Sequence, residues 1–154
     1  WDDATLASEI AISHFNRSLE LIEEDSRSFD LLMDAYKLPK NSEDENAIRS
    51  NAIKQATIHA AEVPLETAKC ALEVMRNLPN LATSGNKNAV SDVGVAALLG
   101  SAACKGALFN VEINLSSLNH NDAPEIFTES EIIKVEIKEL ARACMHAVRK
   151  RLDS

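Results

Sequence analysis

The chain has 154 residues, of which 45% are hydrophobic and 26% are charged, which is the length and composition of one globular domain. Its formal net charge of −8 argues against a nucleic-acid partner, because binding a phosphate backbone requires an excess of cationic side chains. No leader segment is apparent and the longest uncharged stretch, residues 93–104, is too short to cross a bilayer. We therefore expect a cytoplasmic protein without a membrane partner.

The N-terminal segment has the alternating three-four spacing of apolar residues that is typical of a helical bundle seam. This pattern predicts a first helix over about residues 5–36, in which the polar Ser26 interrupts the seam beside Asp25. The stretch KLPKNSEDE (37–45) ends this helix. Ser42 and Glu45 form a Ser-x-x-Glu capping box, which predicts a second helix over about residues 43–61.

Two prolines and a glycine delimit the next predicted helix. Pro64 suits a first helical position, where its missing N–H costs nothing, so we expect a third helix to begin there. Pro79 should kink or end this helix. Gly85 is a natural terminator, because glycine tolerates the backbone conformations in which helices end.

Two further helices complete the predicted fold, one over about residues 88–118 and one from a Thr128–Glu131 capping box to about residue 152. No strand-like alternation is apparent. Five helices with short loops indicate an all-α protein, an up-and-down bundle of about five helices. Long helices with broad small-residue faces would leave apolar surface exposed in a monomer, so we expect a two-fold homodimer.

Standard catalytic and metal-binding motifs are absent from the sequence, including a phosphate-binding glycine loop, H-E-x-x-H and G-x-S-x-G. The four histidines do not occur at ligand spacing, so no metal is expected. The three cysteines are far apart and lack C-x-x-C spacing. This pattern indicates free thiols in a reducing compartment, used as small core residues.

The predicted fourth helix carries polar residues at both ends of one face. Asp92 and Asn110 are eighteen positions apart, which is five full helical turns, or about 27 Å along the axis. Asn114 lies one turn beyond Asn110. An antiparallel copy across a dimer axis could bring Asp92 of one subunit near Asn110 of the other. The alternative is that Asp92 is an early-turn acid favoured by the helix dipole and that the asparagines are surface residues.

Asp25 is the second candidate for chemistry. An acid that flanks a seam position is expected to be partly buried, which suits a general acid or base. The alternative interpretation is a solvated acid within the run EED (23–25).

Four stretches occur in order and at matching distances: EEDSRSFDLLMDAYKLPKN, AAEVPLETA, SGNKNAVSDVGVAALL and GALFNVEINL. Together they resemble the cyclodeaminase domain of formiminotransferase-cyclodeaminase and the stand-alone methenyltetrahydrofolate cyclohydrolases of the same family. The resemblance covers about residues 15–152. It implies an all-helical, dimeric, folate-binding protein whose substrate is a tetrahydrofolate derivative.

The resemblance also implies roles for single residues. The family's catalytic aspartate, four residues before a phenylalanine, falls on Asp25, with Phe29 following. The family's Ser-Asp pair falls on Ser91 and Asp92, which are then expected to bind the substrate.

Four further residues are expected to bind the folate. The asparagines of the stretch NV-x-IN are Asn110 and Asn114, whose amides can orient the pterin. Lys40, at the end of the LPK stretch, and Lys87 can meet the glutamate tail, which the acidic protein would otherwise repel.

One departure from the family concerns the N-terminus. Family chains begin with another helix and a Pro-Gly-Gly-Gly-Ser segment, which WDDATLASEIAISHF does not replace. We therefore expect one cyclodeaminase/cyclohydrolase-like domain over residues 1–154 without that segment. A fragment, omitted residues and a true loss all remain open explanations.

The expected function is an enzyme that closes 5-formimidoyltetrahydrofolate to 5,10-methenyltetrahydrofolate and releases ammonia. One alternative is a methenyltetrahydrofolate cyclohydrolase, which opens the same ring with water. Another is a non-catalytic helical module that binds folate or a protein. A formiminotransferase domain tethered upstream, as a partner, would select the cyclodeaminase.

Overall fold

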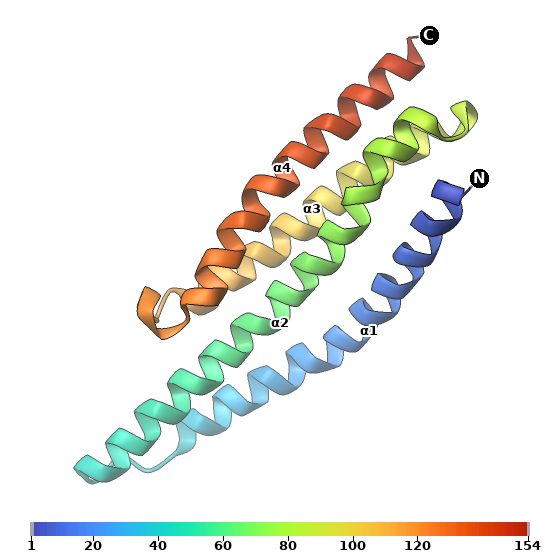
Figure 1. The fold of residues 1–154 in the computed structure, drawn as a ribbon. Helices are drawn as coiled ribbons and strands as arrows, with labels where there is room; N and C mark the ends of the chain where they lie inside the picture. Colours follow the sequence, from blue (N-terminus) through green and yellow to red (C-terminus); the bar gives the residue numbers. More distant parts are fainter. Residues whose placement is uncertain (1, 154) are drawn as a thin grey trace.

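The computed structural model describes residues 2–153, which form four long antiparallel helices (Figure 1). No strand is present within this range, so the predicted all-α, up-and-down architecture is confirmed, with four long helices instead of five. Two 3-10 segments, η1 (Lys87–Ala89) and η2 (His120–Asp122), occupy loops. The four helices are α1 (Asp2–Lys37), α2 (Glu43–Ser84), α3 (Val90–Leu115) and α4 (Pro124–Leu152).

Helix α2 replaces the second and third predicted helices, so the prediction of a new helix at Pro64 is wrong. Both Pro64 and Pro79 lie inside this one helix. A proline within a helix removes one backbone hydrogen bond. At Pro64 the carbonyl that loses its donor belongs to Ala60, and the Asn114 side chain of α3 supplies another at 2.7 Å. The helix continues through both prolines.

The ends of α2 agree with the sequence. The backbone N–H of Glu45 donates to Ser42 Oγ at 3.2 Å, which confirms the predicted cap, and the Glu45 carboxylate accepts from the N–H of Asn41 at 2.7 Å. Gly85 ends the helix in an extended conformation, with φ −69° and ψ −176°.

The start of α4 was predicted wrongly. This helix begins at Pro124, four residues before Thr128, whose hydroxyl donates to the Pro124 carbonyl at 2.8 Å within the helix. A proline at a first helical position starts a helix without losing a hydrogen bond, so no side-chain cap at Thr128 is needed.

The main core lies between α2, α3 and α4. Its fully enclosed side chains come from all three helices: Met75, Cys104, Val111, Ile137 and Cys144. The three cysteines are free and buried, as predicted, and burial raises the pKa of the Cys104 thiol to about 11. These thiols are therefore core residues.

Helix α1 packs mainly against α2, and Figure 1 shows α1 and α4 on opposite sides of the α2–α3 pair. Its buried contact is a small cluster of Leu21 with Val63 and Cys70 of α2. Large apolar side chains remain exposed on α1 and on α3. We call this surface the α1–α3 apolar face; its residues are Ile12, Phe15, Leu19, Ile22, Phe29, Val95, Leu99, Phe109 and Ile113.

Among the described residues, one helical stretch, Lys87–Leu115, is long and apolar enough to cross a bilayer by length and composition. Its most apolar window is 33% buried inside the bundle, and core helices of soluble proteins meet the same criteria. This stretch is longer than the uncharged residues 93–104 of the sequence. Asp92 and Lys105 are single charged residues at the two ends of those residues, and the apolar character continues beyond them.

Candidate functional site

Two adjoining hollows lie where α1, α2 and α3 meet. The first has a volume of about 400 Å³ and is lined by all three helices, including Asp25, Pro64 and Asn110. The second, of about 210 Å³, is lined by Asp25, Phe29, Asn110 and Asn114 among others. Since Asp25 and Asn110 line both, the hollows form one site, whose first part alone has the size of a small-molecule pocket, ~300–1,000 Å³.

Asp25 is held at the edge of this site by the packing of α1. Leu21 and Ser28, about one turn away on either side, are buried, and the Ser28 hydroxyl donates to the backbone carbonyl of Asp25 at 2.8 Å. The Asp25 side chain is exposed, so the expectation of partial burial is wrong for the single chain. The reason is that the adjacent seam residue Ile22 belongs to the uncovered α1–α3 apolar face.

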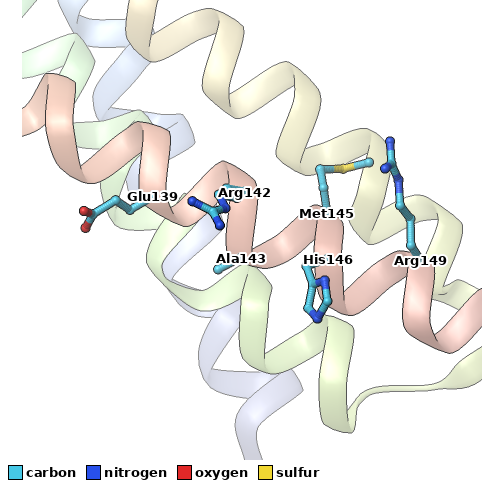
Figure 2. A pocket seen from close by; sticks show the side chains of 6 residues that line it. All are labelled: Glu139, Arg142, Ala143, Met145, His146 and Arg149. Carbon is cyan, nitrogen blue, oxygen red and sulfur yellow. The ribbon is translucent and has the colours of Figure 1, made fainter.

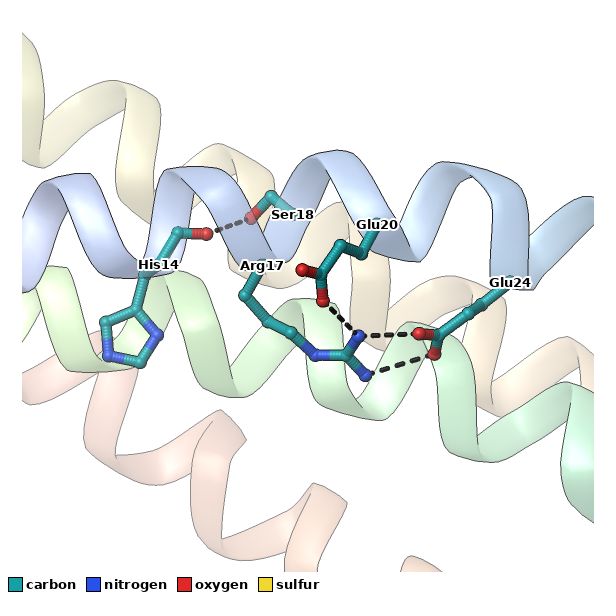
Figure 3. Close-up of polar contacts among 5 residues, drawn as sticks. All are labelled: His14, Arg17, Ser18, Glu20 and Glu24. Atoms are coloured by element: carbon teal, nitrogen blue, oxygen red, sulfur yellow. Dashed lines mark hydrogen bonds and ion pairs between the residues drawn. The ribbon is translucent and has the colours of Figure 1, made fainter.

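Glu24 and Asp25, two residues of the acidic run 23–25, have different surroundings. Figure 3 shows the Arg17 guanidinium bound to both oxygens of Glu24, at 2.6 and 3.0 Å, and to Glu20 at 3.0 Å. The hydrogen bond from Arg17 lowers the pKa of the Glu24 carboxyl, and the pKa of Arg17 is raised in turn. The Glu24 carboxylate is thus engaged within α1, whereas Asp25 lines the hollows.

The two asparagines differ in their contacts. Asn110 is exposed and lines both hollows. Asn114 is half-buried and donates its side-chain amide to the Ala60 carbonyl of α2 at 2.7 Å. Among the described residues that line the hollows, Asp25 is the one ionisable side chain. The site therefore combines one carboxylate with amides, hydroxyls and apolar walls.

The other predicted site residues lie away from Asp25 within one protomer. Ser91 and Asp92 are exposed in the first turn of α3, about 27 Å from Asn110 along the helix. Lys40 lies in the α1–α2 loop and Lys87 in η1, and both are exposed. Because the 42 residues of α2 separate these lysines, they are about 60 Å apart, and one glutamate tail cannot reach both.

Several lining residues were not predicted from the sequence. Ser18 and Thr67 line the first hollow and Ser28 the second. A signal existed for Ser28, which lies three residues after Asp25 and therefore near it on the same helix. Pro64 and Gly106 also line the first hollow. A signal existed for Gly106 alone, because it lies inside a predicted helix, where glycine is unfavourable.

A larger hollow, of about 630 Å³, lies along α4 and is lined by Arg142, His146, Arg149 and neighbouring residues of that helix (Figure 2). One helix supplies all of its lining residues, so it is a surface groove without polar groups converging from several elements. No group of three or more His, Cys, Asp or Glu side chains that could hold a metal ion is found within the described part of the chain.

The fold and the hollows define an all-helical bundle with a small-molecule-sized site between three helices. Residues 4–130 match the sequence model of the formiminotransferase-cyclodeaminase family, and the chain belongs to this family. The resemblance drawn from the four sequence stretches is thereby confirmed.

Individual relatives agree with this assignment. A methenyltetrahydrofolate cyclohydrolase from Methylorubrum extorquens is 38% identical over 99 residues, which are 64% of this chain and 48% of that protein. A formimidoyltransferase-cyclodeaminase from Mus musculus is 37% identical over 98 residues, which are 64% of this chain and 18% of that protein. The chain thus spans about half of the first relative and under a fifth of the second.

A solved structure has a similar fold. The formiminotetrahydrofolate cyclodeaminase from Thermotoga maritima superposes with a TM-score of 0.72 and 27% sequence identity. The superposition covers 86% of this chain and 63% of that chain. The bundle of α1–α4 is therefore shared with a protein of this family.

Proposed function

We propose that the protein is a folate-dependent one-carbon enzyme that closes 5-formimidoyltetrahydrofolate to 5,10-methenyltetrahydrofolate and releases ammonia. The observation that carries the proposal is the position of Asp25 as the one ionisable side chain among the described residues lining the hollows. The names of the relatives from Mus musculus and Thermotoga maritima support this reaction.

The proposed reaction needs one group that moves a proton. The formimidoyl group reacts in its protonated amidinium form: N10 of the folate attacks its carbon, and as the N10–C bond forms, N10 loses its proton to the Asp25 carboxylate. The bond from that carbon to the amino nitrogen then breaks, and the departing nitrogen takes a proton and leaves as ammonia. A positioned carboxylate that accepts one proton and returns it contributes about 10²–10⁴ to the rate.

The same carboxylate also suits the charge of the product. The methenyl bridge carries a delocalised positive charge, and apolar walls around a single carboxylate strengthen its attraction to a developing cation. The neutral amide of Asn110 can orient the pterin, whose N–H groups and ring oxygen match an amide's acceptor and donors.

A second candidate reaction is hydrolysis of methenyltetrahydrofolate, favoured by the 38% identity to a cyclohydrolase. Here water attacks the methenyl carbon and Asp25 accepts the proton that the water loses, after which one C–N bond of the ring breaks. Asp25 performs the same task in both reactions, so the hollows alone do not discriminate between them.

We also propose that the enzyme works as an antiparallel two-fold homodimer in the cytoplasm. The support is the exposed α1–α3 apolar face, which borders the hollows at Ile22. In such a dimer, Ser91, Asp92 and Lys87 of one subunit would lie toward Asn110 of the other. Lys40, in the loop that follows the C-terminal end of α1, would contact the glutamate tail of the folate.

The test is to incubate the protein, with any segment its gene encodes upstream, with each folate separately. Rising methenyl absorbance with stoichiometric ammonia from 5-formimidoyltetrahydrofolate supports the cyclodeaminase. Loss of methenyl absorbance faster than in buffer, without turnover of the formimidoyl compound, selects the cyclohydrolase. A folded protein that changes neither folate would contradict both reactions. If that protein still bound tetrahydrofolate, it would be a non-catalytic binding module.

A further inference from the structure

The carbonyl of Ala60 lacks its regular helical donor because of the proline four residues later, as the carbonyl of Met75 does before Pro79. Proline has no backbone N–H, so Pro64 cannot make the hydrogen bond that this carbonyl would receive in a regular helix, and the proline ring pushes the carbonyl outward. Ala60 is only 6% exposed. A buried carbonyl without a donor is costly, so the freed group requires a partner.

The partner is a side chain from a different helix. Asn114 Nδ2 of α3 donates to the Ala60 carbonyl at 2.7 Å across 54 positions of sequence. This bond does more than satisfy a polar group, because it fixes which end of the amide faces α2. With the nitrogen turned toward Ala60, the amide oxygen points away from that carbonyl.

The anchored amide lies in the candidate site. Ala60 and Asn114 both line the second hollow, together with Asp25 and the buried Ser28. The same hollow therefore contains the Ala60 carbonyl of α2, its donor from α3 and the proposed proton-transfer group from α1. A shift of α3 against α2 at this point would move Asn110, one turn before Asn114, relative to Asp25.

We propose that Asn114 is a positioning residue for the proposed reaction: by donating to the carbonyl that Pro64 frees, it locks α3 onto α2 and sets the distance between Asn110 and Asp25. This inference rests on the proposed function for its catalytic consequence. It assigns Pro64 a purpose that neither helix propensity nor core packing supplies, which is to create an acceptor for Asn114.

A double-mutant cycle of Pro64→Ala and Asn114→Ala tests the proposal, with kcat and KM for the turned-over folate and thermal unfolding as readouts. In Pro64→Ala, the restored N–H of residue 64 competes with the Asn114 amide for the Ala60 carbonyl and weakens the bond between α3 and α2. We expect this variant to remain folded while kcat falls about tenfold or more, as for a small misplacement of catalytic groups. Adding Asn114→Ala should then lower kcat little further.

The unfolding temperature is the second readout of the double-mutant cycle. Asn114→Ala alone should lower the unfolding temperature by about 3 °C or more, since it strands a buried carbonyl, and much less when Pro64→Ala is present. Pro79→Ala, the same substitution about 22 Å further along α2, is the matched control. Its effects should add to those of Asn114→Ala in both readouts.

Three results would overturn the proposal. Equal loss of kcat from Asn114→Ala in both backgrounds, with Pro64→Ala fully active, would make Asn114 a direct ligand. If the effects of the two substitutions on the unfolding temperature are not additive but kcat is unchanged, the bond has a structural role only. If their effects on the unfolding temperature are additive, Asn114 and Pro64 are not coupled and the proposed bond to Ala60 does not matter. If Asn114→Ala fails to fold, a fully active Pro64→Ala contradicts the proposal alone. A wild-type chain without turnover would contradict the proposed function. The unfolding temperatures of the same variants would then still test whether Asn114 stabilises the chain through the Ala60 carbonyl.

Discussion

At the scale of single residues, an ion pair fastens α2 to the loop before α4. Lys54 Nζ binds Asp122 Oδ1, and Asp122 Oδ2 accepts from the backbone N–H of Asn119 at 2.9 Å. The Lys54 ammonium beside it, helped by the Asn119 N–H, holds the pKa of the Asp122 carboxyl below its usual range. The carboxylate therefore stabilises the folded chain only while it is ionised.

This arrangement predicts a pH-dependent effect of Asp122→Asn. Because the folded pKa lies below the unfolded value of about 3.9, the stabilisation is fully present above that value. It is lost as the pH falls through the folded pKa. Thermal unfolding at pH 7 should therefore show a lower midpoint for the variant than for the wild type. The two midpoints should converge as the pH falls below about 3.9, and a difference that stays constant with pH would contradict the ion pair.

The sequence could name Asp25, Asn110 and Asn114 as site candidates, but not how they lie relative to one another. The interrupted seam at Ser26 marked Asp25, and the family resemblance assigned it the chemistry. The approach of Asn110 within the same chain depends on how α3 packs beside α1 and α2, which no local pattern encodes. The Asn114 bond to Ala60 spans 54 positions and could likewise not be predicted from the sequence.

At the scale of the helix, two glycines of α3 have opposite surroundings. A Cβ added at Gly100 would lie 2.8 Å from Met75 Sδ and 3.0 Å from its Cγ, and Met75 is fully enclosed in the core. A Cβ added at Gly106 would meet nothing within 4 Å in the described chain. Gly106 nevertheless lines the first hollow, so close packing within the chain does not require it.

Alanine at the two positions should therefore change stability with opposite sign. Gly100→Ala overfills the core and should lower the free energy of unfolding by about 1–3 kcal/mol. Gly106→Ala adds only helix propensity and should raise it by about 0.5–1 kcal/mol. Urea unfolding of both variants measures this difference. Destabilisation by Gly106→Ala, or tolerance of Gly100→Ala, would contradict the packing of α3.

Helix boundaries were predictable where local chemistry decides them. Ser42 caps α2 and Gly85 ends it, as their residue types indicate. The prediction at Pro64 was wrong because a proline can start a helix or interrupt one. The choice here depends on how α2 packs against the other helices, which is a tertiary property.

At the scale of the whole molecule, the α1–α3 apolar face exposes more large side chains than an isolated chain requires. Ile22 is 64% exposed, Phe109 68% and Ile113 69%. Large exposed apolar side chains of this kind mark an interaction site. The proposed occupant is a second copy of the chain, which would also cover the hollows around Asp25.

The proposed dimer predicts a specific effect of Phe109→Glu. A charge in the centre of the interface should raise the dimer dissociation constant about tenfold or more, which sedimentation velocity measures over a concentration series. Ile132→Glu is the matched control, because Ile132 is similarly exposed, at 58%, on α4 outside the α1–α3 apolar face. A monomeric wild type, or equal dissociation constants for both variants, would rule out this interface.

The architecture of the molecule was the most predictable level. The low aromatic content and the helical spacing of apolar residues indicated an all-α bundle. Four sequence stretches at matching distances indicated the family. The helix count was wrong by one because α2 passes through Pro64. The placement of Lys40 and Lys87 at opposite ends of α2 could not be foreseen without that continuity.

The central claim is that Asp25 carries the proton in a folate reaction, and turnover of Asp25→Asn tests it most directly. Asp30→Asn, an exposed substitution on the same helix outside the hollows, is the matched control. With the folate that the wild type turns over, Asp25→Asn should lose about 10²-fold or more in kcat, with an unchanged circular dichroism spectrum, while Asp30→Asn stays near the wild type. Wild-type kcat in Asp25→Asn would contradict the account.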